Sequence, residues 1–269
     1  MNTMATNPKN KTIRLSACYL LLFLLFSSMT CGHVDYEEEV IFDPQPEWTF
    51  AVYGNSISTY AGTMPLGYPT YYSQSRMEKK NMWWAILGQK TKSAMIANSS
   101  WSGATVAFHQ ALDSISFFYS DYRIASLARN GVPDVIFVLG GTNDWNRSIP
   151  LGNVTDVDKV TTVCGAYSLM VRKLKRFYPN STIILCGILP RKQGVNTKNR
   201  SGWTIKQGNN AIRKIAETLQ VAYIDMEDCG MAQDIQSCTL DGLHPNEMGM
   251  RMIADKIIEA AKSAKLFNF

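Results

Sequence analysis

Residues 48–58 read WTFAVYGNSIS, and this stretch decides how the rest of the chain is interpreted. Its first six residues are rich in aromatic and β-branched types, a composition typical of a buried strand. The next three, Gly54, Asn55 and Ser56, predict a sharp turn that places a serine directly after the strand. In an open α/β fold that position lies at the carboxyl edge of the sheet, where such folds bind their ligands. Because these three residue types also make ordinary turns, the stretch needs support from elsewhere in the chain.

Further apolar runs alternate with amphipathic stretches downstream. The apolar runs cover 94–97, 134–139, 182–188 and 221–226, and the amphipathic stretches lie near 80–90, 120–130, 157–178, 204–220 and 246–265. This alternation predicts a parallel sheet covered by helices on both faces. About five strands with right-handed crossovers give an α/β fold of the flavodoxin-like, three-layer α/β/α type. The Pro-, Gly- and Tyr-rich segment 64–75 is expected to be an ordered loop.

Composition and charge narrow the class of protein. The chain has 269 residues, of which 46% are hydrophobic and 18% charged, so a sizeable core is expected and global disorder is excluded. The formal net charge is +5, but Lys9, Lys11 and Arg14 lie in the leader described next. Since no dense block of Lys and Arg appears later, the charge gives no reason to expect a nucleic-acid partner.

The first 33 residues have the features of an export signal. A basic start is followed by an apolar core over 17–26, which is too short to span a bilayer comfortably. Cys31 follows this core and resembles the lipidated cysteine of a bacterial lipoprotein signal, although Ser28 stands where such signals usually have leucine. We therefore expect an exported, periplasmic or cell-surface protein, with a lipid anchor at Cys31 and a plain signal peptide as alternatives. Residues 34–46 are expected to form a linker, and 47–269 a single domain.

Four cysteines follow the leader. Cys164 and Cys186 lie in apolar runs and are expected to be buried thiols. Cys229 and Cys238 flank a polar loop, and in an oxidising compartment we expect them to form a disulfide. No cysteine pair has the spacing of zinc ligands, and the three histidines are too few for a metal cluster, so we expect no bound metal.

Polar residues follow two of the other predicted strands. Gly103 comes shortly after the second, where a glycine lets backbone approach a ligand closely or begins a helix. Asn143 comes after the third strand and a pair of glycines. Its amide could donate into a cleft at the sheet edge, or it could cap a turn.

A histidine follows the fifth predicted strand. Asp241 precedes His244 by three residues, so one turn of chain can bring the carboxylate to the imidazole. Pro245 restricts the backbone of the histidine toward extended conformations. An N-terminal helix cap would explain the proline well but the histidine poorly. His109 falls in a helix expected over 105–116, where we interpret it as a packing or surface residue.

Together these blocks resemble the SGNH, or GDSL-type, hydrolase family, which is named after a serine, a glycine, an asparagine and a histidine in four separated motifs. The four match Ser56, Gly103, Asn143 and His244 in family order, and the resemblance spans about residues 48–260. The first motif of the family usually reads Gly-Asp-Ser. Here Asn55 replaces the aspartate. The residue at this position shapes the turn and is not a member of the catalytic triad.

The resemblance implies ester hydrolysis through an acyl-enzyme, without a metal or organic cofactor. Ser56 would be the nucleophile, His244 its general base, and Asp241 the group that holds the imidazole tautomer. The backbone N–H groups of Ser56 and Gly103 and the side-chain amide of Asn143 would form the oxyanion hole.

The substrate is less well defined. The chain is similar to a secreted bacterial branch of the family, which suggests removal of acetyl or other short acyl groups from a small ester or an acylated glycan. Tyr68, Tyr71, Tyr72 and Trp145 are candidates for stacking on sugar rings, with core packing as the alternative. Two other functions stay open. One is a lipase or lysophospholipase, which would need an apolar lid that the sequence does not show; the other is a carbohydrate-binding surface protein with weak or lost activity.

Overall fold

The computed structural model describes residues 46–266, and the leader, Cys31 and residues 34–45 of the expected linker lie outside this range. Its five-stranded sheet has the order β2-β1-β3-β4-β5, and every neighbouring pair is parallel. The strands are β1 (Thr49–Gly54), β2 (Ala94–Asn98), β3 (Val135–Leu139), β4 (Thr182–Cys186) and β5 (Ala222–Ile224). This strand order is that of the flavodoxin-like α/β fold, so the predicted fold class is confirmed.

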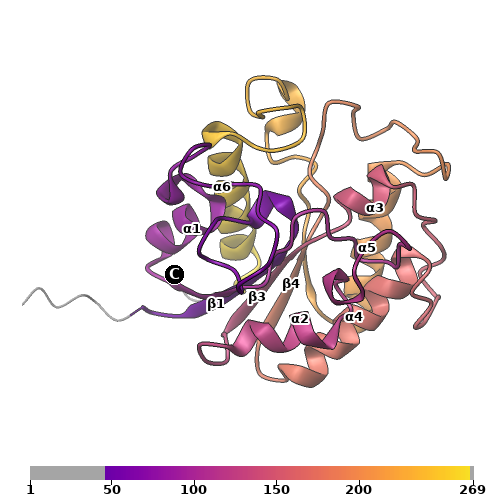
Figure 1. Ribbon diagram of the computed structural model, residues 1–269, viewed down its shortest axis with the longest axis horizontal. Coiled ribbons are helices and arrows are strands. Elements are labelled where there is room, and N and C mark those ends of the chain that lie inside the picture. Colours follow the sequence, from indigo (N-terminus) through magenta and orange to yellow (C-terminus); the bar gives the residue numbers. More distant parts are fainter. Residues whose placement is uncertain (1–45, 267–269) are drawn as a thin grey trace, which may run out of the picture. The chain divides into compact units, whose positions relative to one another are not determined.

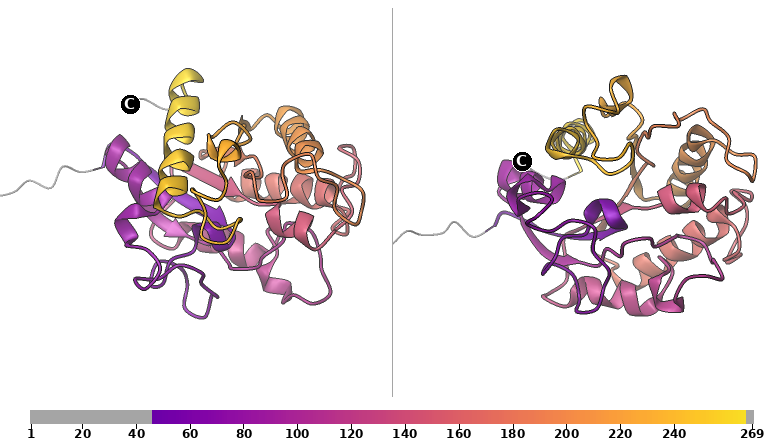
Figure 2. Two further views of the ribbon diagram at one scale, coloured as in Figure 1. Left: turned by 90° about the horizontal axis from the view of Figure 1, so that it is seen from above. Right: turned by 45° about the horizontal axis from the view of Figure 1, so that its top comes forward.

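Helices cover both faces of the sheet, as Figure 1 shows. One face carries α1 (Trp83–Thr91) and α6 (Glu247–Ser263), and the other carries α2 (Asp121–Ala125), α4 (Val163–Phe177) and α5 (Ile205–Leu219). A short helix, α3 (Thr142–Asn146), follows β3. The helices α1 and α6 lie side by side, which is also visible in Figure 2. No helix within the described range combines the length and apolarity needed to cross a membrane.

The two layers of core follow from the alternation of side chains along the strands. In β1, Ala51 and Tyr53 pack with α4 and α5, whereas Phe50 and Val52 pack with α1 and α6. All five residues of β3 are buried, as expected for a central parallel strand that is covered on both faces.

Arg123 of α2 joins the carboxyl ends of two strands. Its side chain is 0% exposed and donates to the carbonyls of Gly54 at 2.8 Å and Ser99 at 2.6 Å. A third hydrogen bond reaches the Ser116 carbonyl at 2.5 Å. A buried guanidinium is tolerated when it is hydrogen-bonded in this way, and here it fixes the sheet edge from which the site is built.

The prediction of a helix over residues 105–116 is wrong. This segment is irregular except for a 3₁₀ turn at Ser114–Ser116, and His109 is a partly exposed loop residue. The cause is a distant carboxylate: Asp144 accepts hydrogen bonds from the N–H groups of Val106 and Ala107, both at 2.9 Å. Backbone donors that are held by a side chain in this way are not available to start a helix.

The expected disulfide is also not formed. Cys229 and Cys238 are buried free thiols, as are Cys164 and Cys186. The Cys238 thiol is directed at the carbonyl of Asp234, 3.0 Å away, and burial raises the pKa of Cys229 to about 11. The two thiols of this loop are therefore packed and protonated.

Candidate active site

Ser56 lies immediately beyond β1, on a 3₁₀ turn formed by Ser56–Ser58. The side-chain oxygen of Asn55 caps this turn by accepting the N–H of Ile57 at 3.0 Å. A carboxylate oxygen would accept the same hydrogen bond, so asparagine can replace the family's usual aspartate here. Gly54 is required by space, since a Cβ at this position would lie 2.8 Å from Ser100 Oγ and from Ser58 Cβ.

The loop that precedes α6 brings a histidine and an aspartate to Ser56. His244 Nε2 lies 3.0 Å from Ser56 Oγ, and His244 Nδ1 lies 2.7 Å from Asp241 Oδ2. The other oxygen of Asp241 accepts the backbone N–H groups of Leu243 and His244 at 3.0 and 2.8 Å. With a proton on Nδ1 donating to the carboxylate, Nε2 is left free to accept the serine proton.

The charges of this pair suit a base that works near neutral pH. Burial lowers the pKa of His244, and the hydrogen bond and charge of Asp241 act in the opposite direction without overcoming it. Burial also acts to raise the pKa of Asp241, but the hydrogen bonds from His244 outweigh it and lower this pKa to about 2. Asp241 is therefore ionised and His244 neutral at pH 7.

We predict that kcat/KM falls on the acid side with a midpoint below the ordinary imidazole pKa of about 6.5. The reason is that protonation of His244 removes the base, and burial lowers the pKa of this imidazole. Hydrolysis of a small ester measured between about pH 4 and 9 gives the midpoint directly. A midpoint clearly above the ordinary value would contradict a desolvated imidazole.

Tyr71 contacts both members of this pair. Its ring stacks on the His244 imidazole, with centroids 3.6 Å apart and planes 9° from parallel, and its hydroxyl donates to Asp241 Oδ2 at 3.1 Å. The guanidinium of Arg76 lies 4.4 Å from the centre of the same tyrosine ring. Burial and the charge of Asp241 raise the pKa of Tyr71, so the phenol stays a donor. The sequence suggested that Tyr71 stacks on a sugar, but its ring is already stacked on the histidine.

We expect Tyr71→Phe to lower kcat/KM by about tenfold, because it removes one hydrogen bond to an ionised carboxylate and keeps the ring stack. Without the phenol, the full charge of Asp241 acts on His244 and raises its pKa. The acid limb of the pH profile should therefore move to higher pH. A loss of activity with an unchanged acid limb of the pH profile would mean that Tyr71 supports the fold and does not affect the pKa of His244.

The two other proposed oxyanion donors follow β2 and β3, which flank β1 in the sheet. Gly103 has φ +82°, which favours glycine, and a Cβ added there would meet nothing within 4 Å. Asn143 Nδ2 donates to the carbonyl of Ala104 at 2.8 Å, which joins the two segments. Among the described residues, the backbone N–H groups of Ser56 and Gly103 have no acceptor, so both are free to bind a substrate oxygen.

Asp144 supports this arrangement and was not singled out by the sequence. It is 0% exposed, and its two oxygens hold the backbone of Val106 and Ala107 against α3. Burial raises the pKa of Asp144 to about 6, against the effect of these hydrogen bonds. The signal in the sequence was an acidic residue three positions after the two glycines that follow a buried strand.

The other aromatic candidates are largely buried by contacts within the protein. Tyr72 is 0% exposed and donates its hydroxyl to the Pro245 carbonyl at 2.7 Å. Trp145 is 6% exposed, and the guanidinium of Arg191 lies 4.6 Å from its ring centre. Tyr68 is 7% exposed and packs on Trp101 at 4.5 Å. Tyr68 and Tyr72 are therefore enclosed by the protein, whereas Trp145 also lines a cavity.

Among the described residues, no group of three or more His, Cys, Asp and Glu side chains is placed to hold a metal ion.

Comparison with known proteins identifies a matching family model and several solved structures with a similar fold. The model of the GDSL-like lipase/acylhydrolase family matches residues 48–261. No curated protein matches the chain in sequence. Among solved structures, a Bacteroides ovatus ATCC 8483 protein that is described as a GDSL-like lipase has a TM-score of 0.62 and 22% identity, over 80% of this chain and 98% of that one.

Two neighbours are esterases. An active-site mutant of a family two carbohydrate esterase from Clostridium thermocellum has a TM-score of 0.58 and 16% identity, over 84% of this chain and 66% of that one. The acetyl xylan esterase AlAXEase has a TM-score of 0.53 and 17% identity, over 79% of this chain and 98% of that one. At these identities the likenesses show the fold, while the family match covers most of the chain. The protein therefore belongs to the GDSL-like lipase/acylhydrolase family, and it is a carboxylic ester hydrolase.

Proposed function

We propose that this protein is a serine esterase that removes acetyl or other short acyl groups from carbohydrates. The observation that carries the chemistry is the continuous chain of contacts from Ser56 Oγ through His244 to Asp241, at 3.0 and 2.7 Å. These are the distances over which a base takes the proton of a nucleophile and is itself held by a carboxylate.

In the first step, Ser56 Oγ bonds to the ester carbonyl carbon while His244 Nε2 takes the hydroxyl proton. Negative charge develops on the carbonyl oxygen, where the N–H groups of Ser56 and Gly103 and the amide of Asn143 stabilise it. The bond to the alcohol then breaks, and His244 returns the proton to the departing alcohol oxygen.

In the second step, water attacks the acyl-enzyme. His244 takes a proton from the water as its oxygen bonds to the acyl carbon, and a second tetrahedral intermediate forms in the same oxyanion site. Collapse releases the carboxylic acid and returns the proton to Ser56 Oγ. Asp241 stays ionised throughout and stabilises the imidazolium formed in each step.

A carbohydrate substrate is supported by the structural neighbours, which include a carbohydrate esterase and an acetyl xylan esterase. The loop over residues 64–75 argues against the lipase alternative. In that loop the tyrosines are engaged with the protein, and Leu66 is its fully exposed large apolar residue. A lipase would be expected to expose a contiguous apolar surface at its site.

The test is a panel of p-nitrophenyl esters from acetate to octanoate, together with acetylated xylan and a lysophospholipid. We expect kcat/KM to be highest for acetate and to fall by about tenfold or more toward octanoate, because a short acyl site rejects extra methylenes. Release of acetate from the glycan is expected. A preference for octanoate or the lysophospholipid would favour the lipase alternative, and no turnover of any ester would favour a carbohydrate-binding protein.

We also propose that the protein is exported and anchored by a lipid on Cys31. The support is the basic and apolar leader followed by this cysteine. Mass spectrometry of the mature N-terminus in a bacterial host tests it. A lipid-modified Cys31 is expected, and an unmodified terminus at another residue would leave a plain signal peptide.

A further inference from the structure

A cavity lies against the short helix α3, which also carries Asn143 of the proposed oxyanion site. Its volume is about 540 Å³, within the size range of small-molecule sites. Trp145 of α3 lines it together with His109 and the loop that includes Lys198 and Arg200. The mechanism proposed above uses none of these residues.

The cavity is strongly cationic. Arg147, Lys198 and Arg200 line it, and none of the described residues that line it is acidic. Within residues 46–266 these three side chains form no ion pair. Arg147 acts electrostatically on Asp144, but that carboxylate is fully buried and accepts two backbone N–H groups. Three unpaired cations around one hollow create a field that favours an anionic ligand.

The loop that carries two of these cations is held in place by α3 and the residues after it. Asn199 Nδ2 donates to the Trp145 carbonyl at 3.1 Å. The N–H of Arg200 donates to Ser148 Oγ at 3.3 Å, and the Ser201 hydroxyl donates to the Ser148 carbonyl. The cationic groups therefore project from an anchored backbone, which limits the conformational entropy lost when a ligand binds.

Arg191 links the cavity to the catalytic residues. It is 5% exposed and stacks on Trp145, and its Nη2 donates to Asn146 Oδ1 at 3.3 Å. Its charge also acts on both His244 and Asp241. The helix α3 and Arg191 therefore connect the lining of the cavity with residues of the proposed catalytic site.

The cavity also has the neutral groups that suit a sugar. Asn146 and Ser148 supply polar side chains, and Trp145 supplies an aromatic wall. Cations combined with these groups match a sugar that carries a negative charge.

We propose that this cavity is a subsite for an acidic sugar, a uronate residue of the acylated polysaccharide whose ester is cleaved at Ser56. Arg147 and Arg200 present planar guanidinium groups, which bind planar carboxylates with two parallel hydrogen bonds. Lys198 adds a third positive charge. The proposal rests on the carbohydrate esterase function and specifies which class of carbohydrate the protein acts on.

Binding is tested on the Ser56→Ala protein, so that the result does not depend on turnover. The ligands are a short oligogalacturonate and its methyl-esterified form, which has the same sugars without the charges. We expect the charged form to bind at least about fivefold more tightly by calorimetry. The difference should shrink when salt is raised to about 0.5 M, because the cations are exposed.

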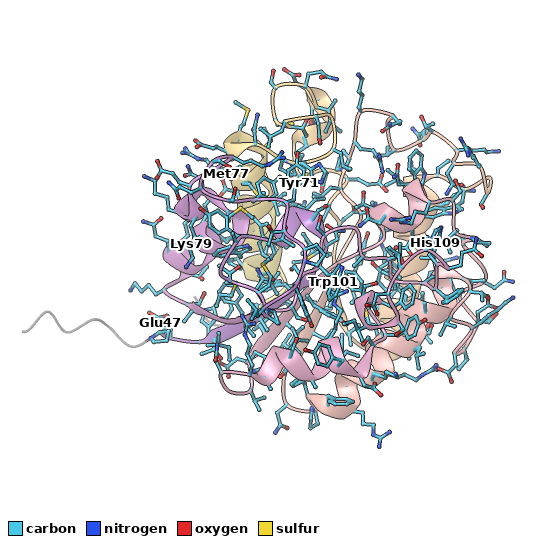
Figure 3. All side chains as sticks on the ribbon, viewed as in Figure 1. Glu47, Tyr71, Met77, Lys79, Trp101 and His109 are labelled. Atoms are coloured by element: carbon cyan, nitrogen blue, oxygen red, sulfur yellow. The ribbon has the colours of Figure 1, made fainter. Side chains whose placement is uncertain are left out.

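Two charge reversals locate the binding. Arg147→Glu and Arg200→Glu, each added to Ser56→Ala, should abolish the preference for the charged form. Lys79→Glu is the matched control: it makes the same change in net charge at an exposed residue, and Figure 3 shows Lys79 on the opposite side of the view from His109. The control should leave the preference intact. Using two variants keeps the test valid if one of them fails to fold.

Three results would overturn the proposal: equal binding of the two forms, a preference that survives both reversals, or an equal loss in the control. Tighter binding of a sulfated galactan oligosaccharide would overturn the uronate assignment. If the charged form binds through Arg147 but the wild-type protein releases acetate from no acetylated glycan, the carbohydrate esterase function fails while the acidic-sugar site stands.

Discussion

The Ser56→Ala protein should fold normally and lose about 10⁴-fold or more in kcat for a small ester such as p-nitrophenyl acetate. The substitution removes the oxygen that attacks the substrate, and the 3.0 Å contact with His244 Nε2 is lost with it. Ser56 lies on a turn that is capped by Asn55, and that hydrogen bond does not involve the hydroxyl. The unfolding free energy should therefore change by less than about 1 kcal/mol.

Ser100→Ala is a suitable control for this variant. Ser100 lies at the same edge of the sheet, and its hydroxyl is buried without a hydrogen-bond partner among the described residues. Removing that hydroxyl should leave both kcat and stability close to the wild-type values. If the Ser56→Ala protein is folded and turns over ester at a rate comparable to the Ser100→Ala protein, Ser56 is not the nucleophile.

The second large effect is expected for Asn143→Ala, which should lower kcat by about 10²- to 10³-fold with little change in KM. One amide N–H of Asn143 is already bonded to the Ala104 carbonyl at 2.8 Å. The second N–H is the one available to a developing oxyanion, where it acts mainly in the transition state. Because the first hydrogen bond is also lost, we expect unfolding to become easier by about 1 kcal/mol.

Asn209→Ala separates these two effects. Asn209 is 0% exposed, and its amide bonds both the N–H and the carbonyl of Ile188 near the end of β4. This variant should lose at least as much stability as Asn143→Ala and keep a much higher kcat. If Asn143→Ala is less stable but retains a kcat within twofold of wild type, Asn143 has a turn-capping role only.

The strands of this fold were predictable because each reads as a short apolar run, and the three central strands β1, β3 and β4 are buried almost throughout. Their ends were less predictable, since they depend on neighbouring strands. The run 182–188 was expected to be strand throughout, yet β4 ends at Cys186. Its pairing with both neighbouring strands stops there, since Cys186 is the last residue of β4 that pairs with β3 and with β5. The stretch 157–178 begins as a helix only at Val163, where the Thr162 side chain accepts the N–H of Gly165.

Part of the site was predictable because parallel α/β sheets place their functional residues at the carboxyl ends of the strands. Ser56, Gly103 and Asn143 were identified because they follow strands, and strand ends meet at one edge. Their partners were not predictable from local pattern. Tyr71 was a candidate for sugar stacking or for packing, and its hydroxyl bonds to Asp241, which is 170 positions away along the chain. Arg123 was missed because nothing in its neighbourhood indicates that it is buried beneath the ends of β1 and β2.

The most direct test of the catalytic assignment is covalent labelling with a serine-reactive fluorophosphonate, followed by peptide mapping of the modified protein. We expect one adduct, on Ser56, formed at a rate that falls steeply in the His244→Ala protein because the serine then lacks its base. Loss of activity should parallel the fraction of Ser56 that is labelled. Complete inactivation without an adduct on Ser56, or an adduct that forms equally fast without His244, would contradict the proposed nucleophile and its base.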